Sequence, residues 1–282
     1  MTSILHGFIL GLIQGITEFL PISSSGHLVL AQEILPNFEA PEMLFDLFLH
    51  VGTLGAVVVA YRRDLMSLLR SILPARGSGV AGETCLESKA GARSFLLMII
   101  VASIPTAIIG LLGEHLAETL FSTPRGVGVG LLVTAALIYG SERAQVGKEQ
   151  LARPIRIRDA LIIGTVQGLA IYPGLSRSGS TISTGLLLGL DRINAARFSF
   201  LLSVPAIAGA VLLKADDLIS QFTVAPHGEL LAWLVGLLTA TVSGILAIIL
   251  LLRLIRQGRF KWFAAYCAAL GVLSLLVTTL AS

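Results

Sequence analysis

Two polar segments, QGITEFLPISSSGH (Gln14–His27) and QGLAIYPGLSRSGS (Gln167–Ser180), interrupt an otherwise apolar chain. Each combines proline, glycine and serine in a short run that a continuous helix would not tolerate well. We therefore predict that residues 4–35 and 160–190 each form two half-helices joined by a loop. Unpaired backbone is allowed at membrane depth only where protein or a wet cavity covers it, so both regions are predicted to be re-entrant.

The composition indicates a membrane protein. Of the 282 residues, 55% are hydrophobic and 13% are charged, whereas a soluble domain carries about 25% charged residues. The predicted fold class is therefore an all-α polytopic membrane protein, with about six transmembrane helices besides the two re-entrant helix-loop-helix segments. The predicted spans lie near residues 44–60, 94–112, 126–140, 198–213, 230–252 and 262–280.

The two polar segments match each other at a constant offset of 153 residues. At this offset Gln14 falls on Gln167, and Ser23 falls on Ser176. The match continues downstream of the segments, where Phe45 falls on Phe198. We therefore predict a duplicated unit with its boundary near residue 150, which gives repeats over residues 1–150 and 151–282.

The basic residues predict the orientation of the chain. Fifteen of the 20 Lys and Arg residues fall in residues 62–93, 143–158 and 253–261. Such clustering is typical of cytoplasmic loops, and it is not the sign of a nucleic-acid site. The span at 44–60 then descends to the cytoplasm and its equivalent at 198–213 ascends from it. This is an inverted-topology repeat, whose site is expected near the membrane midplane where the two breaks meet.

The residues brought together by the two breaks predict an anion site. Ionisable residues inside a membrane are costly and usually functional, and Glu18, His27 and Arg177 are predicted to share one pocket. Each serine-rich stretch precedes a new helix, whose free N–H groups and positive dipole end attract anions. Phosphate or pyrophosphate is the expected ligand. Its predicted binding residues are Ser23, Ser25, Gly26, Ser176, Arg177, Ser178, Gly179 and Thr181.

Glu18 needs a separate explanation, because a carboxylate repels phosphate. One explanation is a divalent cation, Mg²⁺ or Ca²⁺, that bridges Glu18 to the phosphate, with Gln14 as a second oxygen ligand one helical turn earlier. The other is that Glu18 orients His27. His27 could act as general acid, general base or phosphoryl acceptor, or Ser24 could be the nucleophile with His27 as its base. These alternatives stay open, as does direct attack by water.

Other polar residues have simpler explanations. Serine and glycine in a single membrane segment are usually packing residues, so the prediction depends on the two segments together. Asp46 and His50 lie one helical turn apart, so they could pair with each other or line the pocket. Asp191 and Arg192 are expected at a helix end.

Three motifs lie within the two polar regions: Gln14-Gly-Ile-Thr-Glu18, Pro21-Ile-Ser-Ser-Ser-Gly-His27 and Pro173-Gly-Leu-Ser-Arg-Ser-Gly-Ser-Thr181. They resemble the (E/Q)xxxE, PxSSxGH and PGxSRSxxT signatures of the undecaprenyl-pyrophosphate phosphatase family, also called the bacitracin-resistance family. The similarity extends over nearly the whole chain.

The resemblance implies a membrane enzyme that removes one phosphate from undecaprenyl pyrophosphate, the lipid precursor of the cell-wall carrier. It also implies a divalent cation and an active site that opens to the outer face of the plasma membrane. Some members have Glu where this chain has Gln14, which leaves Glu18 as the main acidic metal ligand. The family's essential positions match Glu18, Ser24, His27, Ser176, Arg177 and Thr181 here.

Rival interpretations fit the sequence less well. Lipid phosphatases related to phosphatidic-acid phosphatases share Ser25-Gly26-His27, but their other two elements are missing, and Ser183 stands where the second histidine is required. A transporter or flippase of a prenyl phosphate is the main alternative, because inverted repeats with broken helices are a transport architecture. A structural subunit would not explain the charged breaks. The sequence also leaves open whether the chain forms a homodimer among the membrane lipids.

Overall fold

The computed structural model describes residues 4–34, 43–73, 88–121, 123–145, 152–224 and 227–280. Within these ranges the regular structure consists of helices, with no strand. The helices are α1 (Ile4–Phe19), α2 (Ser24–Ile34), α3 (Met43–Ala60), α4 (Arg62–Ile72), α5 (Lys89–Phe121), α6 (Pro124–Gln145), α7 (Ile157–Leu169), α8 (Arg177–Leu187), α9 (Arg192–Leu213), α10 (Ala215–Val224), α11 (His227–Arg256) and α12 (Lys261–Leu280).

The long apolar helices confirm a polytopic all-α membrane protein. Among the described residues, α5, α6, α9, α11 and α12 each contain a stretch that is long and apolar enough to cross a membrane. A sixth candidate span is α3 with α4, which meet at a bend of 79°. The predicted spans fall on α3, α5, α6, α9, α11 and α12 in chain order.

Both predicted breaks are present. α1 ends at Phe19 and α2 begins at Ser24, while α7 ends at Leu169 and α8 begins at Arg177. The second helix of each pair has 11 residues, a length of only about 16 Å, whereas the apolar core of a bilayer is about 30 Å thick. Neither pair is therefore an unbroken span.

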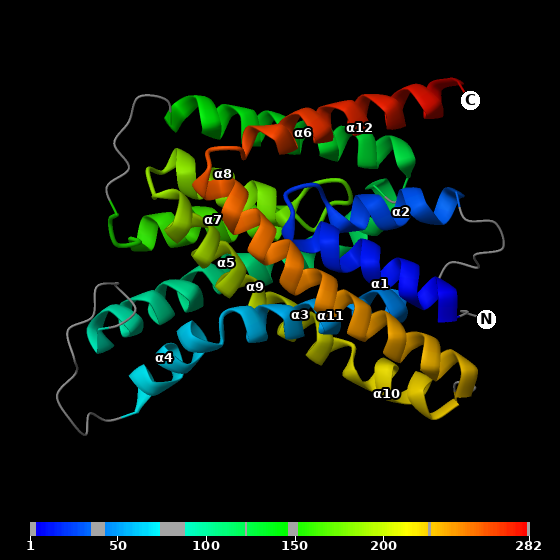
Figure 1. Ribbon diagram of the computed structural model, residues 1–282, viewed down its shortest axis with the longest axis horizontal. Helices are drawn as coiled ribbons and strands as arrows, with labels where there is room; N and C mark the ends of the chain where they lie inside the picture. The colour runs from blue at the N-terminus through cyan, green and yellow to red at the C-terminus, as the bar shows by residue number, and fades with distance from the viewer. Residues whose placement is uncertain are drawn as a thin grey trace.

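Each broken pair packs against a long helix from the other half of the chain. α1 lies along α11, and α7 lies along α5 (Figure 1). Glycines at matching positions permit this closeness: a Cβ on Gly11 would lie 2.3 Å from the carbonyl oxygen of Gly236, and one on Gly164 would lie 2.0 Å from that of Ala102. This exchange is what two repeats related by a pseudo-two-fold axis would produce. Their boundary near residue 150 lies outside the described residues and stays a prediction.

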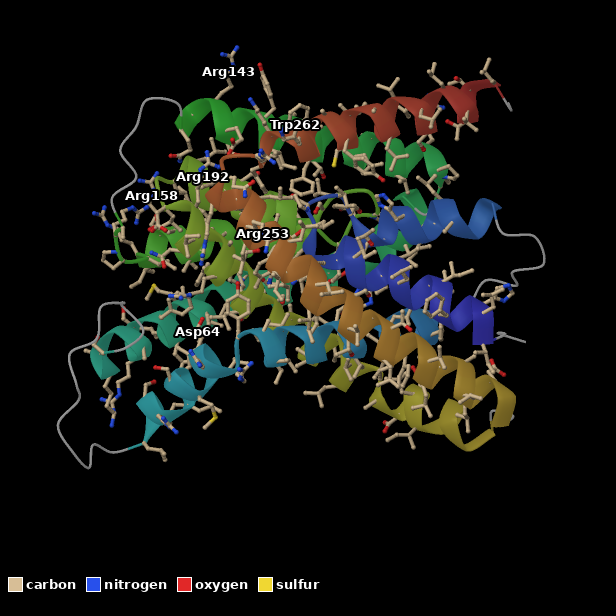
Figure 2. The ribbon with its side chains drawn as sticks, in the orientation of Figure 1. Asp64, Arg143, Arg158, Arg192, Arg253 and Trp262 are labelled. Atoms are coloured by element: carbon tan, nitrogen blue, oxygen red, sulfur yellow. The ribbon has the colours of Figure 1, made fainter. Side chains whose placement is uncertain are left out.

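Arginines gather toward one end of the helix bundle. Figure 2 shows Arg143, Arg158, Arg192 and Arg253, from α6, α7, α9 and α11, on the side of the molecule where α4 lies. Both chain termini lie at the opposite end (Figure 1). The structure therefore gathers these four arginines toward one end, which agrees with the prediction that residues 143–158 and 253–261 face the cytoplasm.

Candidate active site

The two loops share the same capping contact. The backbone N–H of Gly26 donates to Ser23 Oγ at 3.3 Å, and that of Gly179 donates to Ser176 Oγ at 3.1 Å. Each serine thus caps the helix that follows it. In each loop the capping hydroxyl also lies beside the serine hydroxyl two residues later, at 3.4 Å in the first loop and 3.3 Å in the second.

The two loops meet through equivalent positions. A Cβ on Gly26 would lie 3.2 Å from the Cα of Gly174, and one on Gly179 would lie 3.2 Å from the Cβ of Pro21. Gly26 corresponds to Gly179 in the repeat, and Pro21 corresponds to Gly174, so the two contacts are reciprocal. The Ser178 hydroxyl adds a hydrogen bond to a carbonyl oxygen of the first loop. The prediction that the loops face one another is confirmed.

Glu18 is the point at which the two halves join. It is 7% exposed at the end of α1. The Arg177 guanidinium donates to Glu18 Oε1, while the Ser24 hydroxyl donates to Oε2 at 2.5 Å. Ser24 and Arg177 are equivalent positions of the repeat, and each is the first residue of its helix. The amide nitrogen of Gln14 also donates to Oε2, at 3.0 Å. The carboxylate is therefore held by charge-assisted hydrogen bonds from both loops.

His50 also reaches this carboxylate. Its Nε2 lies 3.6 Å from Glu18 Oε2. Its Nδ1 lies 2.7 Å from the backbone oxygen of Asp46, and a carbonyl can only accept, so Nδ1 carries the proton. In neutral His50 the nitrogen that faces Glu18 is then the acceptor. From the sequence, His50 was expected either to pair with Asp46 or to line the pocket. The structure supports the second role. The signal was a polar pair one turn apart within an apolar helix.

His27 points elsewhere. Its Nδ1 donates to the carbonyl oxygen of Ser23 at 2.7 Å, and its Nε2 lies 2.7 Å from the Tyr266 hydroxyl. The two rings stack with their centroids 5.7 Å apart. Within the described structure no hydrogen bond joins His27 to Glu18. Tyr266 was not anticipated, because nothing local marks one tyrosine in the apolar run at 262–280.

Three hydroxyls of the second loop and of the start of α8 form hydrogen bonds within the protein itself. Ser176 caps α8, and Ser178 donates to the Leu20 carbonyl oxygen at 3.3 Å. Thr181 Oγ1 donates to the Arg177 carbonyl at 2.8 Å and lies 2.5 Å from Ser199 Oγ. These bonds fix the backbone that carries Arg177. Phosphate binding by these three hydroxyls stays a prediction. The first backbone N–H groups of α2 and α8 have no partner within their own helices, so they are the donors that a helix N-terminus offers to an anion.

Comparison with known proteins assigns the chain to a family. The model of the family described as "Bacitracin resistance protein BacA" matches residues 7–273, which include both loops. The chain belongs to this BacA family.

Three relatives illustrate the similarity. Proteins named undecaprenyl-diphosphatase from Desulfosudis oleivorans, Korarchaeum cryptofilum and Methanosphaera stadtmanae are 46%, 44% and 41% identical to this BacA-family chain. The alignments cover 97%, 97% and 99% of this chain, and 98%, 99% and 99% of the respective relatives. The similarity therefore extends over whole proteins and not only over the loops.

The donor set of this BacA-family site fits a divalent cation that the substrate helps to hold. Gln14 Oε1 is buried and has no hydrogen-bond partner, although the amide lies against Glu18. Amide and carboxylate oxygens are the ligands that Mg²⁺ and Ca²⁺ prefer. No cluster of three or more His, Cys, Asp or Glu residues that could hold a metal was found in the described part of the chain. Mg²⁺ often binds through one or two carboxylates and completes its shell with substrate phosphate oxygens, so Gln14 and Glu18 are the residues that would hold such an ion, and its binding stays a prediction.

Proposed function

We propose that this chain is an undecaprenyl-diphosphatase. This hydrolase converts undecaprenyl pyrophosphate and water to undecaprenyl phosphate and inorganic phosphate. The product is the lipid carrier of cell-wall precursors, so its recycling serves peptidoglycan synthesis and underlies bacitracin resistance. The observation that carries the proposal is the contact of Arg177 with Glu18 between two facing helix N-termini. The curated relatives named for this activity support it.

Arg177 and the two helix ends form the anion grip in this proposal. The structure assigns one guanidinium nitrogen of Arg177 to Glu18. A guanidinium has five N–H donors in a planar fork, so donors remain for two phosphate oxygens. The first N–H groups of α2 and α8 add neutral donors and the positive ends of two helix dipoles. A pyrophosphate, with two adjoining phosphoryl groups, matches two such ends better than a single carboxylate would.

Ser24 is the nucleophile that the geometry favours. Its hydroxyl lies 2.5 Å from Glu18 Oε2, so the carboxylate can accept the proton as Oγ attacks the terminal phosphorus. The bond from that phosphorus to the bridging oxygen breaks, and undecaprenyl phosphate leaves. Water then hydrolyses the phosphoserine and releases inorganic phosphate. Mass spectrometry after rapid quenching should recover phosphate on Ser24. Recovery on His27 instead, or no trapped residue, would contradict this step.

Gln14 and Glu18 are the proposed ligands of a Mg²⁺ or Ca²⁺ ion. When bound, the ion would neutralise charge on the pyrophosphate oxygens. Chelation with EDTA should stop phosphate release, and Mg²⁺ or Ca²⁺ should restore it. Glu18→Gln should raise the metal concentration needed for half-maximal activity. Full activity in the presence of chelator would remove the metal from the proposal.

We propose that the protein resides in the plasma membrane with its arginine-rich end in the cytoplasm. The active site then opens to the outer face, and the prenyl tail of the substrate lies in the outer leaflet. Cysteine-accessibility labelling of intact cells tests this orientation. A cysteine introduced at Arg158 should react only after permeabilisation, and labelling in intact cells would reverse the orientation.

The second candidate function is a transporter or flippase of a prenyl phosphate, which the broken helices would also suit. Purified protein in detergent separates the two. Phosphate release from a prenyl pyrophosphate, abolished by Arg177→Ala and by Ser24→Ala, supports the enzyme. Movement of lipid between leaflets of reconstituted vesicles without any phosphate release would favour the transporter.

A further inference from the structure

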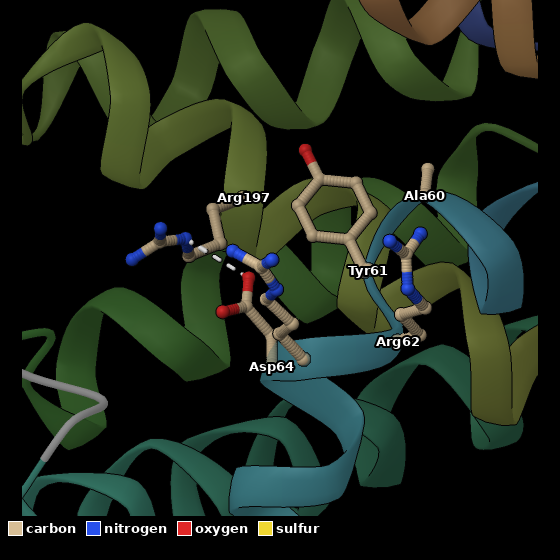
Figure 3. Close-up of a pocket in the computed structure, with 6 residues that line it drawn as sticks. Ala60, Tyr61, Arg62, Asp64 and Arg197 are labelled. Carbon is tan, nitrogen blue, oxygen red and sulfur yellow. Dashed lines mark ion pairs between the residues drawn. The ribbon is translucent and has the colours of Figure 1, made fainter.

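An arginine-lined cavity lies at the bend between α3 and α4, outside the candidate active site (Figure 3). It has a volume of about 420 Å³ and is lined by Ala60, Tyr61, Arg62, Arg63, Asp64 and Arg197. Tyr61 follows His50 by 11 residues, a distance of roughly 16 Å along a helix. This cavity is therefore separate from the site at Glu18.

The charge of the cavity is positive. Three arginines and a single carboxylate line the cavity, and that carboxylate, Asp64, lies 3.2 Å from Arg197 Nε (Figure 3). Asp64 therefore holds the arginine that α9 contributes. Arg63 is exposed and has no ion-pair partner among the described residues. The pairing leaves an excess of two positive charges, so the ligand that fits this cavity is an anion.

The surroundings of the cavity are those of a membrane surface. The 79° bend turns α4 away from the direction of α3, and α4 lies at the end of the molecule opposite the two termini (Figure 1). α4 buries Leu68 and exposes Met66 and Leu69, which are 47% and 59% exposed, beside its arginines. A helix with apolar residues on its exposed side and arginines next to them is typical of the lipid headgroup region.

A second opening continues the first one toward these apolar residues. It has a volume of about 340 Å³ and is lined by Arg62, Arg63, Met66 and Arg70. Arg62 and Arg63 line both openings, so a charged group beside them could join an apolar chain that runs along Met66. Free inorganic phosphate would use only the charged part of this surface.

We infer that the arginine-lined cavity at the α3–α4 bend binds the headgroup of an anionic phospholipid. Its phosphate contacts Arg63 and Arg197, and its acyl chains lie against the exposed apolar residues of α4. The leaflet concerned is the cytoplasmic one in the orientation proposed above. Anionic lipids give that surface a negative potential, which attracts arginines close to it.

The test compares two arginines at the same end of the purified full-length protein. Native mass spectrometry measures the apparent Kd for phosphatidylglycerol and for phosphatidylcholine in wild type, Arg63→Ala and Arg158→Ala. Both arginines are exposed, and Arg158 does not line the cavity. We expect wild type to prefer phosphatidylglycerol, Arg63→Ala to weaken its binding roughly fivefold, and Arg158→Ala to leave it unchanged. Arg63→Lys should recover part of the affinity.

Three outcomes would overturn the inference. They are equal affinity for the two lipids in wild type, equal weakening by the two alanine variants, and competition by millimolar inorganic phosphate that fully displaces the lipid. The last would make the cavity a site for free phosphate. Prenyl pyrophosphate hydrolysis, measured in parallel, should be unchanged in Arg63→Ala. Loss of hydrolysis in wild type would count against the proposed function and not against the lipid site.

Discussion

The two broken helix pairs, α1–α2 and α7–α8, have the same order of helix, capped loop and helix, but they carry different charged side chains. Both loops are capped by a serine that accepts from a glycine N–H three residues later. Yet Glu18 has Ile171 as its equivalent, and Arg177 has Ser24. One half thus supplies the negatively charged side chain and the other the positively charged one, and the two form an ion pair across the repeat. The repeated helices and capped loops therefore fix where the two loops lie, while side chains that differ between the repeats create the single site.

The pairs also differ in how firmly they are anchored. At the start of α7, Asp159 accepts from the Arg153 guanidinium at 2.6 Å and from the Arg156 N–H at 2.9 Å. The first loop instead carries a non-glycine residue with positive φ, Ser23 at +69°, whereas its equivalent Ser176 has φ −71°. Strained residues of this kind cluster at functional sites. The loop next to Glu18 therefore has the more strained backbone of the two.

The largest effect is expected where the two halves join. Glu18→Gln leaves Arg177 without its charged partner, and Arg177→Gln leaves a 6% exposed carboxylate without one. The double substitution leaves no charge unpaired. We expect all three variants to lose at least about 100-fold in phosphate release. We expect the double variant to be about 2 kcal/mol more stable than the sum of the single effects predicts.

Thermal unfolding in detergent measures that coupling, and phosphate release measures the activity. Arg192→Gln is a matched control, because Arg192 also makes an interhelical ion pair, with Glu142, but on other helices. If the changes in unfolding free energy of the two single variants simply add up in the double variant, the contact between Glu18 and Arg177 contributes no coupling.

A smaller effect is expected at the anchor of the second half. Burial opposes ionisation of Asp159, but hydrogen bonds from Arg153 and Arg156 hold the pKa of its carboxylate below the usual 3.8. A lowered folded-state pKa stabilises the fold above the unfolded value, and this stabilisation is lost as the pH falls through the folded value. Asp159→Asn should therefore cost about 1–3 kcal/mol at neutral pH.

The pH profile is the diagnostic measurement for this anchor. The difference in unfolding free energy between wild type and Asp159→Asn should be constant above about pH 5 and shrink below about pH 4. Asp216→Asn, at an exposed position on α10, serves as the control. A difference that does not change with pH would show that the charge of Asp159 is not what stabilises the helix start.

The smallest effect concerns the strain in the first loop. Ser23→Gly removes a cap but also removes the cost of a positive φ, which is about 1 kcal/mol or more for a residue with a side chain. Ser176→Gly removes a cap at a residue whose backbone is relaxed. We expect Ser23→Gly to leave the unfolding midpoint nearly unchanged or raise it, and Ser176→Gly to lower it. Equal shifts would mean that the two loops do not differ in strain.

Much of the fold could be predicted because its signals are local. The apolar runs give the spans, and the Pro, Gly and Ser runs give the breaks. The offset of 153 residues gives the pairing of the loops. The bend of 79° after Ala60 was not predicted. The bend lies at Tyr61, in a sequence that has neither proline nor glycine at that point.

The contacts of the two histidines could not be predicted, because they depend on where side chains point after the helices pack. Of the two, His50 lies beside Glu18. His27 instead bonds to Tyr266, which is 239 residues away in sequence. The pattern of residues within a single helix cannot predict a contact between residues so far apart in sequence.

In the proposed mechanism, the second half contributes a planar arginine clamp for pyrophosphate. Its most direct test is kcat/KM for release of phosphate from undecaprenyl pyrophosphate by wild type, Arg177→Lys and Arg192→Lys. A lysine keeps the charge but not the planar fork, so we expect Arg177→Lys to fall by about 100-fold or more. Arg192→Lys should stay within a few-fold of wild type. Near wild-type kcat/KM for Arg177→Lys would contradict the account.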